Sequence, residues 1–252
     1  MKPLFIVCCP NIEKHLGKDR LEKEIKNLEK MRVVDESKRD LAFDLGIGVI
    51  HMVDRLIKSS EKAIDFQKWT KEAKESKDLK DCLFELSCIS ELSKHNTVTI
   101  KKRRENKVPD AYIESEGIYF EMTNLENVPQ SIELKINDLC EKSEDRFGED
   151  KGIHMVGING FYEYSKEQDK MIEKEELSKF IEDLKRKTQN LSKNVLCFIL
   201  VHNYINFNPK TEKLTWNQTP PYIICNGNAD IPLLERVWGK LNIIKKEDLA
   251  KE

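Results

Sequence analysis

The sequence lacks an excess of charge of either sign. Its 252 residues include 43 Lys and Arg and 45 Asp and Glu, which gives a formal net charge of −2 at pH 7. A chain with this balance has no overall basic field, so any binding of nucleic acid must depend on a local patch. Charged residues are 35% of the chain and hydrophobic residues 39%. This composition predicts a soluble protein with a densely charged surface and enough apolar residues for a real core.

Long hydrophobic runs are also missing. No apolar stretch approaches the roughly 20 residues that a helix needs to cross a bilayer. The short apolar run at residues 4–9 is ended by Pro10 and followed by dense charge, which argues against a signal peptide. The sequence therefore predicts neither membrane insertion nor secretion.

The cysteines lack the spacing of a metal module or a disulfide framework. There are seven, an odd number, with no Cys-x-x-Cys motif and no nearby pairing with histidine. Most lie in apolar contexts, such as Cys197 within a run of hydrophobic residues. We expect reduced core cysteines and a cytoplasmic protein.

Residues 11–78 carry a helical pattern with few breakers, and apolar residues recur there at helical spacing. Within this region His51 and Asp54 stand one helical turn apart, as half of a metal site could. No partner histidines are visible nearby, so we interpret them as a packing pair on a helix. The sequence thus predicts a mainly helical N-terminal extension over residues 1–78, which covers the rest of the protein or contacts a protein partner.

The stretch from Val108 to Thr123 predicts a β-hairpin. Residues 111–114 and 118–123 are rich in Tyr, Ile and Phe, and Gly117 supplies the positive φ of the turn between them. Pro109 ends the preceding segment, so the carboxylate of Asp110 lies at the mouth of the first strand.

Alternation along the second strand separates an apolar face from a polar one. Ile118, Phe120 and Met122 share the face that we expect in the core, whereas the opposite face carries Tyr119, Glu121 and Thr123. Two carboxylates on paired strands repel each other, and a hard divalent cation with oxygen ligands relieves that repulsion. Alternatively, Asp110 caps a turn and Glu121 is a solvated strand residue.

The order of the neighbouring segments favours the metal-binding interpretation. A predicted helix with Glu85 and a strand at residues 97–100 precede the Pro109-Asp110 pair; Glu121-Met122-Thr123 follows it, then a helix at residues 131–147 and a strand at 153–158. This order resembles that of the PD-(D/E)XK nuclease superfamily over residues 79–201. The resemblance implies a restriction-endonuclease-like α/β domain at residues 79–252, with a mixed sheet flanked by helices.

The resemblance also implies metal-dependent hydrolysis of a phosphodiester. Asp110, Glu121 and the backbone carbonyl of Met122 would hold Mg²⁺, or Mn²⁺ in its place, and Glu85 would complete the shell. Such an ion polarises the phosphoryl group and helps to generate hydroxide from water. Glu85 lies beside the apolar stripe of its helix, where a carboxylate needs a partner. A surface salt bridge is the competing interpretation of that residue.

Thr123 departs from the family pattern, which has Lys at this position to orient the attacking water and to offset negative charge. Threonine can form hydrogen bonds but supplies no charge. Some members of the superfamily carry this cation on the following helix. There, Lys135, Lys142 and Arg146 fall on one flank of the apolar stripe, and we favour Lys142 or Lys135 as the replacement. If neither reaches the site, we expect a nuclease-fold module that binds nucleic acid or a protein partner without cutting.

A basic run precedes the hairpin and would flank the proposed site. It supplies possible phosphate contacts, and we favour DNA over RNA as the nucleic acid. A solvated loop is the alternative for this run. Its members are Lys101, Lys102, Arg103, Arg104 and Lys107.

The remaining segments fit a mixed sheet. The continuous apolar run at residues 194–201 predicts a strand buried on both faces at the centre of the sheet. We expect the tail to finish the sheet edge and to end in a short helix near residues 233–241.

Overall fold

The computed structural model describes residues 9–31, 39–76, 82–101, 108–165, 170–208, 213–218, 221–227, 229 and 231–238. The chain divides into two compact units. The first unit comprises residues 1–100 and 204–217, and the second comprises residues 101–203 and 218–252. This division does not coincide with the predicted boundary between residues 78 and 79, which stays a prediction.

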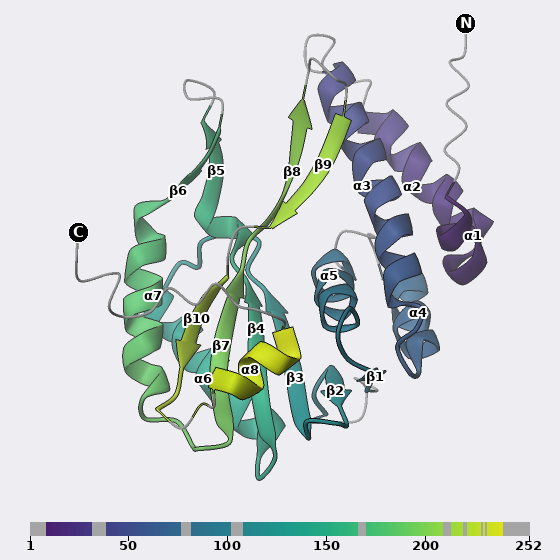
Figure 1. Cartoon of the computed structure of the whole chain (residues 1–252). Helices are drawn as coiled ribbons and strands as arrows, with labels where there is room; N and C mark the ends of the chain where they lie inside the picture. The colour runs from purple at the N-terminus through teal and green to yellow at the C-terminus, as the bar shows by residue number, and fades with distance from the viewer. Residues whose placement is uncertain are drawn as a thin grey trace, which may run out of the picture. The chain divides into compact units, whose positions relative to one another are not determined.

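The first unit is mainly helical within the described residues (Figure 1). Its helices are α1 (Pro10–Leu16), α2 (Lys18–Met31), α3 (Arg39–Ser60), α4 (Phe66–Glu75) and α5 (Leu83–Leu92). Strand β1 (Val98–Ile100) follows α5. Strands β8 (Asn203–Asn208) and β9 (Lys213–Gln218) form a two-stranded sheet that groups mainly with this unit. Helices are therefore present, as predicted, in the described parts of residues 11–78, which are residues 11–31 and 39–76.

Asp54 of α3 holds the start of α1. One carboxylate oxygen accepts hydrogen bonds from the backbone N–H groups of Asn11 at 2.8 Å and Ile12 at 2.9 Å. The other accepts one from the Asn11 side chain at 2.8 Å. These contacts satisfy backbone donors that the helix leaves unpaired at its first turn. They agree with the interpretation of Asp54 as a packing residue.

The second unit is built on a mixed sheet. Its strands are β2 (Ala111–Ile113), β3 (Ile118–Asn124), β4 (Lys151–Gly157), β7 (Val195–Val201) and β10 (Tyr222–Cys225), and they lie side by side in the order β2-β3-β4-β7-β10. Strands β3, β4 and β7 are parallel, whereas β2 and β10 run antiparallel to their neighbours. Every residue of β7 is buried, as expected for a central strand. The predicted α/β class and mixed sheet are confirmed.

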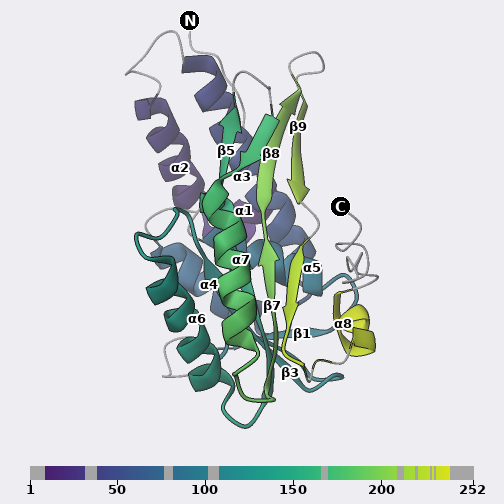
Figure 2. The same ribbon diagram turned by 90° about the vertical axis from the view of Figure 1, so that its left-hand side faces the viewer.

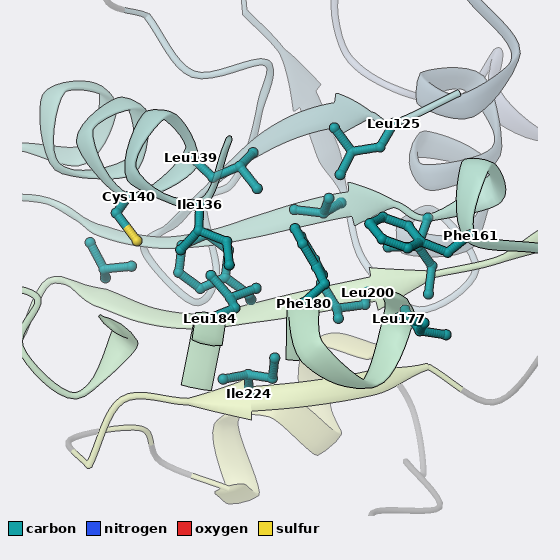
Figure 3. Packing of buried hydrophobic residues seen from close by; sticks show 14 of the residues in the cluster. Leu125, Ile136, Leu139, Cys140, Phe161, Leu177, Phe180, Leu184, Leu200 and Ile224 are labelled. Carbon is teal, nitrogen blue, oxygen red and sulfur yellow. The ribbon is translucent and has the colours of Figure 1, made fainter. Parts of the chain in front are cut away.

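Helices cover this sheet. Figures 1 and 2 show α6 (Ile132–Phe147) and α8 (Ile231–Trp238) on opposite faces of it. Helix α7 (Glu175–Thr188) packs with α6 over one core, in which Phe161 and Phe180 contact each other (Figure 3). A short helix at Asn159–Phe161 and a hairpin of β5 (Tyr162–Ser165) and β6 (Lys170–Glu173) connect β4 to α7. The sequence analysis did not anticipate this hairpin or the β8–β9 pair.

The stripe on α6 packs into the core: Ile136, Leu139 and Cys140 point into it (Figure 3). Phe147 is also buried, and Ile132 is partly buried against the same core. Helix α5 buries Phe84, Leu86 and Ile89, so its buried surface is wider than the single apolar stripe predicted beside Glu85. No helix within the described ranges is long and apolar enough to cross a membrane.

Candidate active site

The hairpin of β2 and β3 brings Asp110 beside Glu121. The antiparallel register pairs Ala111 with Phe120, and its next step places Asp110 opposite Glu121. On the other side of β3, Glu121 pairs with His154 of β4. An oxygen of Asp110 accepts a hydrogen bond from the backbone N–H of Met122 at 2.7 Å. This bond fixes the Asp110 carboxylate at the mouth of its strand, next to the carboxylate-bearing face of β3.

Glu121 is a buried carboxylate, although it lies on the polar face of its strand. Its residue is only 2% exposed, because α6 packs over this face. Burial raises the pKa of Glu121, and the neighbouring charge of Asp110 raises this pKa further; Lys142 and Arg146 oppose both effects. The Oε2 atom of Glu121 accepts no hydrogen bond. A buried, unsatisfied carboxylate oxygen beside a second carboxylate favours a cation at this place.

Lys142 reaches this centre from α6. Its Nζ atom lies 2.7 Å from Oε1 of Glu121 and donates a hydrogen bond of 3.0 Å to Oγ1 of Thr123. Arg146, one turn later, places its Nε atom 3.7 Å from Oε2 of Glu121. Lys135 is engaged elsewhere, because its Nζ atom lies 2.6 Å from a carboxylate oxygen of Asp138. Of the two lysines that the sequence offered, the structure brings Lys142 to Glu121.

His154 is a site residue that the sequence analysis missed. It is fully buried on β4, and its Nε2 atom lies 2.9 Å from Oγ1 of Thr123. Burial lowers the pKa of His154 to about 3, and the charge of Lys142 contributes to this shift, so the imidazole is neutral at pH 7. The alternation of the strand predicted at residues 153–158 could have pointed to this residue. It places His154 on the face opposite Ile153 and Met155, as a polar residue in an apolar strand.

Lys101 is the described member of the predicted basic run. Its ammonium lies 4.8 Å from the ring centre of Tyr112 and 5.8 Å from that of Tyr119, two rings that are 4.4 Å apart. Tyr112 and Tyr119 face each other across β2 and β3, two pairs further along the hairpin than Asp110 and Glu121. The other members of the run, Lys102, Arg103, Arg104 and Lys107, lie outside the described residues. Their role in binding nucleic acid stays a prediction.

Two carboxylates at this centre, those of Asp110 and Glu121, are the side chains that would hold a hard cation. Among the described residues, no group of three or more His, Cys, Asp and Glu side chains could hold a metal ion. Asp110 and Glu121 provide two carboxylates, and Mg²⁺ is commonly bound through one or two carboxylates while it keeps several waters. Glu85 lies on α5 in the first unit, so its part in the shell stays a prediction.

A cavity of about 650 Å³ lies elsewhere in the second unit, between the start of α6 and α7. Ser131, Ile136 and Lys179 are among the residues that line it, and neither Asp110 nor Glu121 is. The cavity is therefore separate from the centre formed by Asp110 and Glu121.

Comparison with known proteins found no match for this chain among protein-family models, curated proteins or solved structures. Its function has to be argued from the site itself.

Proposed function

We propose that this protein is a metal-dependent nuclease of the PD-(D/E)XK type, with a restriction-endonuclease-like second unit. The observation that carries the proposal is the position of Lys142, whose ammonium lies within hydrogen-bond distance of both Glu121 and Thr123. The position that holds Lys in the family pattern is Thr123 here. An ammonium from α6 occupies the space beside it, as a lysine moved to the following helix would.

The order of the elements supports the fold part of the proposal. Along the chain, α5 is followed by β1, β2, β3, α6 and β4. This is the order helix, strand, strand, strand, helix, strand on which the resemblance rests. Asp110 immediately precedes β2 and Glu121 lies within β3, in the order of the two motifs.

The chemistry divides among a few residues. Asp110 and Glu121 would hold Mg²⁺ or Mn²⁺, which supplies polarisation of the phosphoryl group and a more acidic bound water. Asp110 is oriented by the Met122 N–H, and Glu121 by Lys142. The Lys142 ammonium can orient the attacking water by donating a hydrogen bond, and it offsets negative charge that grows in the transition state. Lys101 can contact a phosphate of the substrate, and we favour DNA.

One observation favours a second function, a binding module without catalysis. Lys142 and Arg146 both lie close to Glu121 and offset its charge, as a bound cation otherwise would. Because these cations offset the charge of Glu121, the folded site can be stable without a bound metal ion. The surface around Lys101 would then serve for binding nucleic acid or a protein partner.

Cellular location belongs to the proposal as well. The described cysteines are thiols, and Cys9, Cys88, Cys140 and Cys197 are buried. Reduced, buried thiols suit a cytoplasmic protein.

The test is cleavage of labelled single- and double-stranded DNA and RNA with Mg²⁺ or Mn²⁺. We expect the wild type to cut at least one substrate, and Asp110→Ala and added chelator to abolish the cutting. Glu182→Ala, which removes an exposed carboxylate on α7, is the matched control and should cut like the wild type. Thermal melting of each variant checks the fold. If the folded wild type cuts nothing and binds nucleic acid as tightly as Asp110→Ala does, the binding module is the correct function.

A further inference from the structure

A continuous chain of hydrogen bonds links the buried His154 to Lys142. The Nε2 atom of His154 lies 2.9 Å from Oγ1 of Thr123, which accepts a 3.0 Å hydrogen bond from Lys142. The Nδ1 atom of His154 lies 2.8 Å from Oγ of Ser143. Ser143 in turn donates a 2.8 Å hydrogen bond to the backbone carbonyl of Leu139. This series of hydrogen bonds therefore runs from Ser143 on α6 to His154 on β4. From there it passes to Thr123 on β3 and ends at Lys142, again on α6.

The direction of every bond in this chain follows from the Leu139 carbonyl. Ser143 has a single hydroxyl proton and donates it to that carbonyl, so its oxygen must accept from Nδ1–H of His154. A neutral imidazole carries one N–H, which leaves Nε2 as the acceptor for the Thr123 hydroxyl. Because the Thr123 hydroxyl donates its proton to His154, its oxygen can take part in a further hydrogen bond only as an acceptor. Lys142 provides that donor.

We propose that His154 is a positioning residue that acts through Thr123 to fix the ammonium of Lys142 against Glu121. This inference rests on the proposed function only in giving Lys142 a task in cleavage; the positioning itself can be measured without cleavage. Thr123 is then the link that lets a lysine from a helix replace a lysine from the strand.

The physical need for this link comes from the lysine side chain. Lys142 is long and flexible, its side chain is 31% exposed, and a contact with Glu121 alone lets the ammonium rotate toward water. A second acceptor at a set position restricts the ammonium to one place. His154 supplies this restraint, because it holds the Thr123 hydroxyl proton away from Lys142.

The same geometry predicts that restoring the family residue will not help. Thr123→Lys would place a second ammonium beside Glu121 and would leave Nε2 of His154 without its donor. We therefore expect lower cleavage by Thr123→Lys than by the wild type. Higher cleavage would mean that Thr123 merely replaces a catalytic lysine and does not connect His154 to Lys142, and it would overturn the inference.

The direct test is the rate at which an amine-acetylating reagent modifies Lys142, measured by peptide mass spectrometry. Lys135 on the same helix is the internal reference, since it pairs with Asp138 outside the chain of bonds. We expect Thr123→Val and His154→Phe to raise the Lys142 rate by about tenfold relative to Lys135, the effect of losing one hydrogen bond from a charged donor. Thr123→Ser keeps the hydroxyl and should restore the wild-type ratio.

Two controls keep the test decisive. Thr188→Val removes another buried hydroxyl, one that donates to Leu184 on α7, and should leave the Lys142 rate unchanged. If His154→Phe fails to fold, nitrogen NMR of the wild-type imidazole decides, because the inference requires a proton on Nδ1 and none on Nε2.

The outcomes separate the inference from the proposed function. An unchanged Lys142 rate in Thr123→Val, or a proton on Nε2 of His154, overturns the positioning role. A raised rate in a protein that cuts no nucleic acid supports the positioning and rejects the nuclease function. Where the wild type does cut, Thr123→Val should lower kcat by about tenfold with KM little changed, because positioning acts on the chemical step.

Discussion

The ammonium nitrogen of Lys142 lies 2.7 Å from a carboxylate oxygen of Glu121, so two residues 21 positions apart along the chain, one on a helix and one on a strand, meet at one charged centre. Glu121 is buried beside a second acid, Asp110, and the cation offsets part of the repulsion between them. Removing the ammonium leaves that repulsion in place, and under the proposed nuclease function it also deprives the attacking water of a hydrogen-bond donor.

Lys142→Ala is expected to lower the rate of metal-dependent cleavage by about 100-fold, in the range for loss of a positioned proton donor. Lys135→Ala is the matched control, because it removes a lysine of the same helix that pairs with Asp138. Initial rates on the best substrate of the cleavage panel measure both. Equal losses of cleavage rate in the two variants would show that the positive charge of α6 as a whole, rather than the position of the Lys142 ammonium, supports cleavage.

Glu121→Gln is expected to make the metal-free protein more stable at pH 8. The folded state raises the pKa of Glu121 above its ordinary value of 4.5, so ionised Glu121 opposes folding. Below pH 4.5 the side chain is protonated in both states, and the penalty is absent; it develops as the pH rises through the folded-state pKa. The stability difference between variant and wild type should therefore grow from pH 4 to pH 8 in urea unfolding with chelator present.

Lower stability of Glu121→Gln than of the wild type at pH 8 would mean that the ion pairs of Glu121 with Lys142 and Arg146 stabilise the folded state by more than burial of the charge destabilises it. We expect the opposite, because both cations are partly exposed, with side-chain exposures of 31% and 27%. Water can therefore solvate them when residue 121 carries no charge.

Added Mg²⁺ is expected to raise the melting temperature of the wild type and to leave that of Glu121→Gln unchanged, since a ligand that binds only the folded state stabilises it. A scan of melting temperature against Mg²⁺ concentration measures this effect. Asp110→Ala should lose the response too, and Glu182→Ala should keep it. A wild-type melting temperature that does not respond to Mg²⁺ or Mn²⁺ would count against metal binding.

Gly160→Ala is expected to destabilise the protein by about 1–3 kcal/mol, the usual cost of overpacking. An added Cβ atom at Gly160 would lie 2.4–2.5 Å from backbone atoms of Asn127, and backbone cannot yield as a side chain does. Gly227→Ala is the control, because nothing lies within 4 Å of its added Cβ, and it should stay within about 0.5 kcal/mol of the wild type. Urea unfolding compares the two variants, and equal stabilities would show that the loop at Asn127 moves freely.

Lys101→Ala is expected to weaken binding to nucleic acid of any sequence and to reduce the salt dependence of log affinity by about one unit. The ammonium lies over the rings of Tyr112 and Tyr119, which hold it beside the hairpin that carries the carboxylates. Fluorescence anisotropy at several salt concentrations measures this slope. Lys193→Ala removes an exposed lysine before β7 and should leave the slope unchanged.

Local patterns in the sequence predicted much of the second unit. The alternation in Ile118–Asn124 indicated a strand with one apolar face, and Ile118, Phe120 and Met122 are buried as expected. The apolar run that ends at Val201 indicated a central strand, and the stripe on residues 132–147 indicated a helix packed on one side. Each of these features depends on a period of two or 3.6 residues, which the chain sets by itself.

These local patterns could not predict which distant segments contact each other. Lys135 and Lys142 lie on the same flank of α6, and the sequence could not choose between them. The choice depends on which turn of α6 packs over Glu121. His154 was missed for the same reason, since its partners Thr123 and Ser143 come from another strand and from a helix.

The sequence by itself determined the strands β3 and β7, the helix α6 and the faces on which Asp110 and Glu121 lie, because side-chain direction follows from backbone geometry. Only the tertiary structure decided that Glu121 is buried, that Lys142 rather than Lys135 neutralises it, and that His154 anchors the link through Thr123. The register of β3 with β4 and the depth at which α6 packs on them set these contacts. Both are consequences of core packing over the whole unit rather than of any local run of residues.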